Sequence, residues 1–512
     1  MTKKFYFLLL LLATQQAFAQ VPEEALRISW RTQAGTARNQ AIGGAMGSLG
    51  GDGTAALVNP AGLAFFKTSD FILSPGYQFA NSSGLFRGTS NTQKQDGQLN
   101  IGTSGFVFGG FGYKARNSFS VTVTRTADFN QRLSYKGQND YSSFAEPLAD
   151  EFAASGLTID QALNSNSMSL TTKMALYTYL VDTATIGGTT QVIARSEFTP
   201  LLNQEHISEI SGGITDINFG WGYEVSKKFM AGVSFGVPIL KIDRNTYFRE
   251  SDASGNNDND FNYLAYRENF RQTGIGVYLK GGLIYRPKEY IRLGLALHSP
   301  EGFILKENFN AGFAADLEKL FAPNSGYDSV ASSVLTGNGT ETYRYTTMTP
   351  GRIILSGSYV FREVENITRQ KGFITADIEY TNYKWMKFAS SEEETADTKA
   401  YYKPFNEAID AIYKGAFNFR LGGELKFNTI MARLGFAYYS SPYKDKALKA
   451  SKMNLSGGIG YRNKGQFIDL TYVHQFSKDV NFPYRVNSPR ANTFATLKDT
   501  KGTLLLTLGF KI

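Results

Sequence analysis

Few residues in this sequence have the types and spacing that catalysis or metal binding requires. The three histidines, His206, His298 and His474, lie far apart in the chain, and no cysteine is present to supply a thiolate. No His-Glu-X-X-His motif or comparable cluster of histidine with carboxylates occurs. His474 follows Tyr472 on an apolar row, but no serine or asparagine partner for nucleophilic catalysis can be placed beside it. We therefore predict a protein that is not an enzyme and holds neither metal nor cofactor.

Two further segments could bind ions and are interpreted otherwise. The Asp- and Asn-rich stretch 251–260 misses the EF-hand spacing, which favours a solvated loop over a calcium site. Residues 40–63, QAIGGAMGSLGGDGTAALVNPAGL, are rich in glycine, yet no Lys-Ser or Lys-Thr follows as a phosphate-binding P-loop needs. Ordering so many glycines costs backbone entropy, so we expect the segment to be ordered only if other parts of the chain enclose it. Asn59 and Pro60 then form a turn, because proline fixes its own φ and disfavours the α region for the residue before it.

Segments that alternate between apolar and polar residues follow from there to the C-terminus. In 416–427, for example, Phe417, Phe419 and Leu421 alternate with polar neighbours. About fourteen strands can be assigned, near residues 70–80, 102–114, 117–128, 212–225, 229–242, 272–286, 291–299, 350–362, 371–381, 416–427, 430–440, 452–462, 466–476 and 502–512.

The connections between these strands indicate the kind of sheet. Short links, such as 115–116 and 362–370, take turns with long ones, which are 81–101, 129–211, 243–271, 300–349, 382–415, 441–451 and 477–501. A soluble sandwich also alternates, but it has no reason to keep its long loops at one end. Transmembrane barrels have short periplasmic turns and long extracellular loops. We therefore predict an all-β fold, a transmembrane antiparallel β-barrel of about 14 strands, with the glycine-rich N-terminal segment as a plug inside it.

The start of the chain predicts export. Residues 1–19 carry two lysines, an apolar run and Ala17-Phe18-Ala19, which is the pattern of a cleaved signal peptide. We predict three parts: a signal peptide at 1–19, an N-terminal plug or hatch at 20–69, and an outer-membrane barrel at 70–512. Its largest extracellular loop is 129–211, in which 144–152 and 170–181 have apolar spacing that suits short helices. No run of about 18 apolar residues is present for a membrane-spanning helix.

The composition supports a barrel and bears on partners. The chain has 51 Gly, 14% aromatic residues and only 19% charged residues, which suits strands with aromatic girdles. Its formal net charge of +8 could attract anionic lipid or ligands, although a solvated surface with excess lysine is favoured. The basic residues are scattered along an exported chain, so nucleic acid is not expected as a partner.

Residues 34–63 resemble the N-terminal hatch of the FadL-type outer-membrane transporters. The shared features are small residues, Met-Gly, an acidic residue and Asn-Pro-Ala-Gly-Leu before the first strand, and Asn59, Pro60 and Ala61 match the hatch motif directly. The resemblance is specific in this segment. Over the rest of the chain it extends only to the overall architecture, a barrel of many strands. It implies a passive, monomeric channel for hydrophobic small molecules, long-chain fatty acids above all or aromatic hydrocarbons. In that family the outer loops capture the molecule, and plug movement releases it through a gap at an inward strand kink.

Charged residues are expected along the lumen-facing row of the barrel. They are Asp216, Glu224, Lys280, Arg292, Asp377, Glu379, Arg420, Glu424, Lys426 and Arg433. Many should pair, because a bare charge in a tight barrel is costly. A fatty-acid carboxylate would need a base left partly unpaired beside apolar walls, and we select Lys280, Arg292 and Arg433 as candidates. Two alternatives stay open: a general porin, which needs an open lumen, and a surface protein that binds a ligand such as hemin on its loops.

Overall fold

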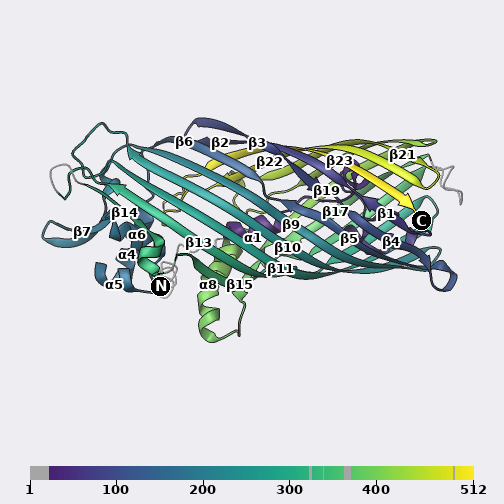
Figure 1. The fold of residues 1–512 in the computed structure, drawn as a ribbon, viewed down its shortest axis with the longest axis horizontal. Coiled ribbons are helices and arrows are strands. Elements are labelled where there is room, and N and C mark those ends of the chain that lie inside the picture. The colour runs from purple at the N-terminus through teal and green to yellow at the C-terminus, as the bar shows by residue number, and fades with distance from the viewer. Residues whose placement is uncertain (1–21, 322–325, 338, 362–370, 488–489) are drawn as a thin grey trace, which may run out of the picture.

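The computed structural model describes residues 22–321, 326–337, 339–361, 371–487 and 490–512. The predicted signal peptide and the predicted short link 362–370 lie outside the described residues. Long strands run side by side around one axis, with helices α4–α6 at one end and the C-terminus at the other (Figure 1). We name these the loop end and the turn end.

The strands close into an antiparallel ring, because β1 pairs with both β4 and β23. The ring has fourteen members, and we call each of them a wall, whether it consists of one strand or of two successive strands. Eight walls are single strands: β9 (Leu202–Ser226), β10 (Phe229–Asp252), β11 (Tyr263–Lys288), β19 (Gly415–Phe427), β20 (Ile430–Tyr439), β21 (Ser451–Asn463), β22 (Gln466–Asn481) and β23 (Ala495–Lys511). Six walls are each built from two successive strands: β1 (Asp70–Leu73) with β2 (Pro75–Phe86), β3 (Thr89–Ile101) with β4 (Ser104–Phe111), β5 (Asn117–Asp128) with β6 (Gln131–Asn139), β12 (Ile291–His298) with β13 (Gly302–Asp316), β15 (Glu341–Met348) with β16 (Arg352–Phe361), and β17 (Gly372–Asn382) with β18 (Lys387–Ser390). The predicted barrel and its strand count are confirmed.

Apolar side chains point outward from this ring over a continuous belt. In β19, Phe417 and Phe419 are 54% and 46% exposed, whereas the intervening Asn418 is 2% exposed. The same alternation recurs in β11, where Ile275, Val277 and Leu279 are 53%, 55% and 62% exposed. A belt of this size would drive aggregation in water, so its natural cover is lipid, and the ring crosses a membrane.

The strands continue well past this belt, which corrects several predicted loops. β10 ends at Asp252 and β11 begins at Tyr263, so most of the predicted loop 243–271 is a strand hairpin. The predicted loop 81–101 is likewise the β2–β3 hairpin, which turns at Arg87-Gly88 with positive φ at both residues. Beyond the belt the outer face meets water, so the outward residues become polar and the apolar alternation that marks a strand disappears.

Helices and short strands cover the loop end. They are α4 (Glu146–Ser155), α5 (Ile159–Asn164), α6 (Leu170–Tyr177), β7 (Val181–Ile186), β8 (Thr189–Ala194), η3 (Arg195–Phe198), β14 (Tyr327–Ala331), α7 (Ser332–Thr336), η5 (Tyr383–Trp385), α8 (Ala396–Ile412) and η6 (Lys446–Leu448), while η2 (Tyr113–Ala115) lies at the turn end. The helices predicted within 144–152 and 170–181 are found as α4 and α6. The sequence reading missed α8, whose N-terminus is a capping box between Thr395 and Thr398. In the described part of the chain, no helix is long and apolar enough to cross a membrane.

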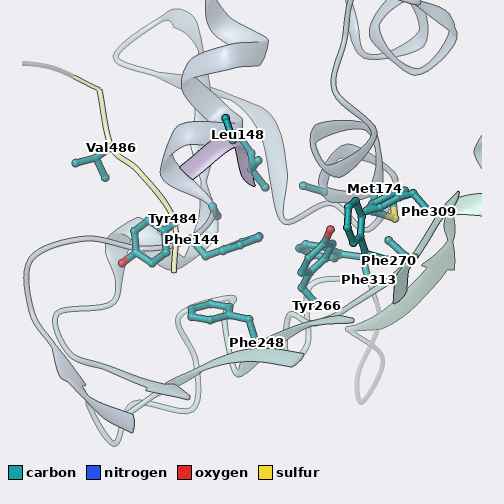
Figure 2. Packing of buried hydrophobic residues seen from close by; sticks show 14 of the residues in the cluster. Phe144, Leu148, Met174, Phe248, Tyr266, Phe270, Phe309, Phe313, Tyr484 and Val486 are labelled. Carbon is teal, nitrogen blue, oxygen red and sulfur yellow. The ribbon is translucent and has the colours of Figure 1, made fainter. Parts of the chain in front are cut away.

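An aromatic cluster fixes the helices to the barrel strands (Figure 2). The Phe144 ring, just before α4, lies 5.0 Å from that of Phe248 on β10 and 5.6 Å from that of Tyr266 on β11. Tyr484, from the β22–β23 connection, meets the Phe144 ring edge-on at 6.0 Å. Buried aromatic pairs of this kind add stability beyond the area they bury.

The N-terminal segment lies inside the ring. It contains α1 (Pro22–Ser29), α2 (Ala37–Ala41), α3 (Ala55–Val58) and η1 (Pro60–Phe65). Its backbone exchanges hydrogen bonds with inward side chains on opposite sides of the barrel: Thr507 on β23, Ser456 on β21, Asp377 on β17, Ser234 on β10 and Ser118 on β5. A segment that touches strands all around a closed ring is enclosed by it, and this enclosure is the condition that so glycine-rich a stretch needs for order.

Candidate functional site

A large cavity, with a volume of about 1940 Å³, lies at the loop end of the barrel interior. Three parts of the chain line it. Leu26 and Trp30 come from the N-terminal segment, and Leu148 of α4 and Phe405 of α8 come from the helices of the loop end. Much of the rest comes from inward residues of β2, β5, β6, β9, β10, β11, β21, β22 and β23. The volume is large compared with ordinary ligand pockets, which hold about 300–1,000 Å³.

The lining mixes apolar and charged side chains. The apolar side chains include Leu26, Trp30, Phe129, Phe144, Leu148, Phe248, Phe309, Phe405 and Val473. One group of charged side chains lies on β21, β22 and β23 as Lys452, Asp479, Asp499 and Lys501, next to Asn454 and Gln475, and others, such as Arg244 and Glu268, lie on β10 and β11. Such a lining can contact both an apolar chain and a charged end of one molecule.

Helix α1 is held at the cavity by ion pairs and by a cation–π contact. Glu24 accepts from Arg244 of β10, whose other nitrogen donates to Glu268 of β11 at 2.9 Å. The Lys452 ammonium lies 4.2 Å from the Trp30 ring centre and donates to the Trp30 carbonyl oxygen at 2.6 Å. These contacts tie the first helix to three walls of the barrel.

A buried carboxylate joins the first loop-end helix to the barrel well beyond the belt. Glu250 on β10 accepts from the Ser143 hydroxyl, from the Phe144 backbone N–H at 3.1 Å and from the Gln204 amide at 2.6 Å. Burial raises the pKa of Glu250 to about 7, although these hydrogen bonds favour the ionised form. Nearby, burial lowers the pKa of His206 to about 4, so its imidazole, stacked on Tyr135 at 4.9 Å, is neutral at pH 7.

The hatch motif lies deeper, against the walls near the turn end. The Asn59 amide donates to the carbonyl oxygens of Gly47, Leu283 and Leu295 at 2.6, 3.2 and 3.4 Å, and its Oδ1 accepts from the Ala61 N–H at 3.1 Å. Asn59 therefore joins two parts of the N-terminal segment to β11 and β12. Pro60 starts η1, where its missing N–H leaves no donor unsatisfied.

The three predicted ligand-binding bases contact the N-terminal segment or other walls, and none of them lines the large cavity. Lys280 donates to the Leu57 carbonyl oxygen at 3.0 Å, and Arg292 donates to that of Leu49 at 2.7 Å. Arg433 is buried between Glu424 and Asp469, with its Nε 2.6 Å from the Glu424 carboxylate. Their role in ligand binding stays a prediction, and the contacts observed here are those of groups that anchor neighbouring segments.

Most of the expected lumen charges do pair. Arg420 lies 3.1 Å from Glu379 and 3.6 Å from Asp377, and all three side chains are almost fully buried. Glu224 pairs with Lys67 of the N-terminal segment. Pairing across neighbouring strands is how charges in so tight an interior avoid the cost of isolation.

The barrel wall has a seam where the strand ladder between neighbouring walls is interrupted. The pairing of β4 with β5 ends at Ser104 opposite Val123. Beyond that point β3 pairs with β2 and β6 pairs with β9, and within the described residues no ladder joins β3 to β6. β6 turns inward, since its Leu133 packs with Phe86 and Leu497 in one buried cluster. The cavity reaches the seam, because Gly102 on one side and Phe129 on the other both line it.

The seam lies next to β4, which is rich in glycine. Gly105 and Gly110 of β4 have positive φ values of 143° and 68°. A side chain at Gly109 would meet the Thr68 carbonyl oxygen at 2.4 Å, so at that position glycine serves packing against the N-terminal segment. The interruption itself lies at 101–104 and 126–131, which sequence reading did not identify.

Comparison with solved structures shows the same fold in three proteins of low sequence identity. A Pseudomonas aeruginosa FadL homologue matches with a TM-score of 0.53 at 14% identity, over 94% of this chain and 99% of that one. The Ralstonia pickettii toluene transporter TbuX matches with 0.51 at 13% identity, over 94% and 100%. The P. putida toluene transporter TodX matches with 0.51 at 12% identity, over 94% and 99%.

These matches define the class of fold. The chain has the FadL-type barrel, which confirms at the level of fold the resemblance seen in residues 34–63. No family model and no curated protein sequence matches it.

Sequence reasoning missed the residues of the large cavity. Trp30 and Phe405 lie 375 positions apart, and Lys452 belongs to a third region of the chain. Only the closed ring brings them together, so no local pattern marks them. The one available signal was Trp30 itself, a bulky aromatic residue just before the glycine-rich stretch.

Proposed function

We propose that this protein is a passive outer-membrane channel for hydrophobic compounds, with long-chain fatty acids as the favoured substrates. In this proposal the loop-end helices capture the molecule, the large cavity holds it, and movement of the N-terminal segment, acting as a plug, releases it. The observation that carries the proposal is that one cavity is lined by the loop-end helices, the N-terminal segment and the wall seam together. The FadL-type fold supports it.

The seam is the proposed way out of the cavity. Strand edges without partners are tolerated in a membrane only beside protein or water, so an interrupted ladder needs a local reason. A passage for cargo between β3 and β6 supplies one. Side chains such as Asn130 and Gln131, which line the cavity at this point, can solvate the open backbone groups.

The contacts of the N-terminal segment argue against the two alternatives. A general porin needs an open lumen, whereas this segment bonds to walls on opposite sides of the ring. A receptor that binds ligand on its loops alone needs no cavity shared with the N-terminal segment. For hemin in particular, His206 is buried and its ring is stacked on Tyr135.

A disulfide lock tests the plug directly, because the chain contains no cysteine of its own. The Ser48 hydroxyl of the N-terminal segment lies 3.1 Å from that of Ser358 on β16. In the Ser48→Cys, Ser358→Cys variant we expect oxidation to abolish uptake of a labelled long-chain fatty acid by proteoliposomes. Reduction should restore it.

The matched control places the same chemistry away from the plug. The hydroxyls of Ser83 and Ser90 lie 3.4 Å apart across the β2–β3 hairpin. Oxidised Ser83→Cys, Ser90→Cys barrels should transport like the parent. Uptake that survives a complete Ser48–Ser358 lock would refute plug movement. Large ion conductance with no saturable fatty-acid binding would instead favour the porin.

A further inference from the structure

The loop-end edge of the apolar belt carries rows of cations. On β10, β11 and β13 the last outward apolar residues are Ile239, Ile275 and Ile304, which lie directly opposite one another and are 44%, 53% and 59% exposed. The next outward-facing row lies two residues further along each strand, toward the loop end. It contains Lys241, Thr273, Lys306 and Arg344. The charges therefore begin where the lipid-facing surface stops.

Two of these cations form a like-charged pair across adjacent strands. Lys306 of β13 and Arg344 of β15 are direct partners in the ladder, and both are exposed. Directly opposite residues have Cβ atoms about 5 Å apart, and like charges there are destabilising. Among the described residues, neither forms an ion pair or a side-chain hydrogen bond.

The arrangement recurs elsewhere on the ring. Lys478 of β22 is the direct partner of Lys498 of β23, and it lies two residues beyond the outward Phe476. Both lysines are exposed, and in the described part of the chain neither has a carboxylate partner. Two unrelated strand pairs thus keep an uncompensated double positive charge at the same level of the barrel.

A carboxylate does lie near the first pair, but other cations hold it. Asp243 accepts from Arg271 and lies 3.3 Å from Lys241. It therefore balances those two side chains and leaves Lys306 and Arg344 uncompensated. Within the described residues, no carboxylate compensates either of the two like-charged pairs.

We propose that these two pairs, Lys306–Arg344 and Lys478–Lys498, bind anionic phosphorylated headgroups of lipids in the adjacent leaflet. A phosphate placed between two cations at a strand pair removes their repulsion and accepts several hydrogen bonds. The acyl chains of the same lipid then lie along the apolar belt just below, on Ile304 in one site and Phe476 in the other. This continuity with the belt selects a lipid over a free anion. The inference needs only the membrane-spanning barrel and does not depend on what the channel carries.

The test is lipid binding to the purified barrel in detergent, followed by native mass spectrometry. The probes are dioleoyl phosphatidic acid, dioleoyl phosphatidylcholine and dioleoylglycerol, with inorganic phosphate as competitor. We expect phosphatidic acid to bind preferentially, and Lys306→Gln with Arg344→Gln to weaken that site about tenfold or more. A matched variant, Lys136→Gln with Lys319→Gln, removes two exposed lysines beyond the belt edge and should bind like the parent.

A charge reversal separates binding from simple loss of charge. Arg344→Glu turns the like-charged pair into an opposite-charged one, so it should raise the unfolding temperature in lipid-free detergent. The stabilisation that phosphatidic acid gives to the parent should be smaller in this variant. Equal binding of phosphatidic acid to the parent and the double-glutamine variant, equal binding of phosphatidylcholine, or complete competition by inorganic phosphate would each overturn the proposal.

Discussion

At the scale of single residues, Asn59 joins the N-terminal segment to the barrel. Its amide reaches three carbonyl oxygens on two different walls and one turn, which no hydrophobic residue of that size can do. The motif was recognisable from the sequence because Asn-Pro constrains the local backbone. Its partners on β11 and β12 were not, since they lie more than 220 residues away in the sequence.

Replacing Asn59 should loosen the N-terminal segment without opening the ring. For Asn59→Ala we expect a loss of about 1–3 kcal/mol in the free energy that holds the segment, because buried carbonyls lose their donor. Ion conductance in planar bilayers should rise with brief openings. Asn310→Ala, which removes an exposed amide on β13, is the control. Unchanged conductance in Asn59→Ala would contradict a holding role for this side chain.

Glu250 should make the stability of the loop end depend on pH. Its carboxyl holds a proton in the folded state up to a pKa of about 7, against 4.5 when unfolded. The folded state therefore binds more protons between these values, and stability is lost as pH rises through the folded pKa. The expected loss is about 3 kcal/mol between pH 4.5 and 7. Denaturant unfolding across this range, followed by tryptophan fluorescence, should show the slope in the parent and a flatter one in Glu250→Gln.

At the scale of elements, the N-terminal segment packs closely against the barrel strands. A side chain at Gly282 of β11 would meet Asn59 Oδ1 at 1.9 Å, whereas one at the neighbouring Gly281 would meet nothing within 4 Å. Gly282→Ala should therefore displace the turn at Asn59, and Gly281→Ala should not. We expect a destabilisation of about 1–3 kcal/mol from the first and little from the second. Equal denaturation midpoints for Gly282→Ala and Gly281→Ala would show that the N-terminal segment shifts to make room for the new side chain at no cost in stability.

The seam can be tested with a second disulfide. The Thr103 and Thr124 hydroxyls lie 2.8 Å apart where the β4–β5 ladder ends. Oxidised Thr103→Cys, Thr124→Cys barrels should release cargo several-fold more slowly, because the lower end of the seam can no longer widen. Binding of fatty acid to the cavity should be unchanged, which distinguishes a blocked exit from a damaged site. Full transport by the oxidised variant would place the exit elsewhere.

Strands were most easily predicted where lipid imposes a pattern. Their cores stood out because lipid-facing residues such as Phe417, Phe419 and Leu421 must be apolar. Past the belt, outward residues such as Asp243 and Asn245 meet water, so the hairpin they belong to looked like a loop. The three candidate bases do not line the large cavity for a related reason: alternation gives the face of a strand but not what packs against that face.

At the scale of the whole molecule, the ring has charge pairs of its own besides those that it shares with the N-terminal segment. Arg433 pairs with Glu424 and Asp469, and Arg420 pairs with Glu379, from wall to wall. Glu424 also lies 3.5 Å from Arg38 of α2. Because the wall-to-wall pairs remain, a variant lacking residues 22–66 should still fold into a heat-modifiable barrel and should conduct ions steadily. Failure to assemble, judged by gel mobility with and without heating, would show instead that the segment templates the ring.

The length of β9, β10 and β11 has a consequence for where cargo is collected. These strands have 25, 24 and 26 residues, or about 80 Å along each strand at 3.3 Å per residue. Even with a tilt of about 40° they rise about 60 Å, while the apolar thickness of such a membrane is about 25 Å. More than half of this height thus stands outside the apolar layer. In the proposed function, a hydrophobic molecule captured at the loop end would enter the barrel beyond the polar headgroup region and would not have to cross that region unaided.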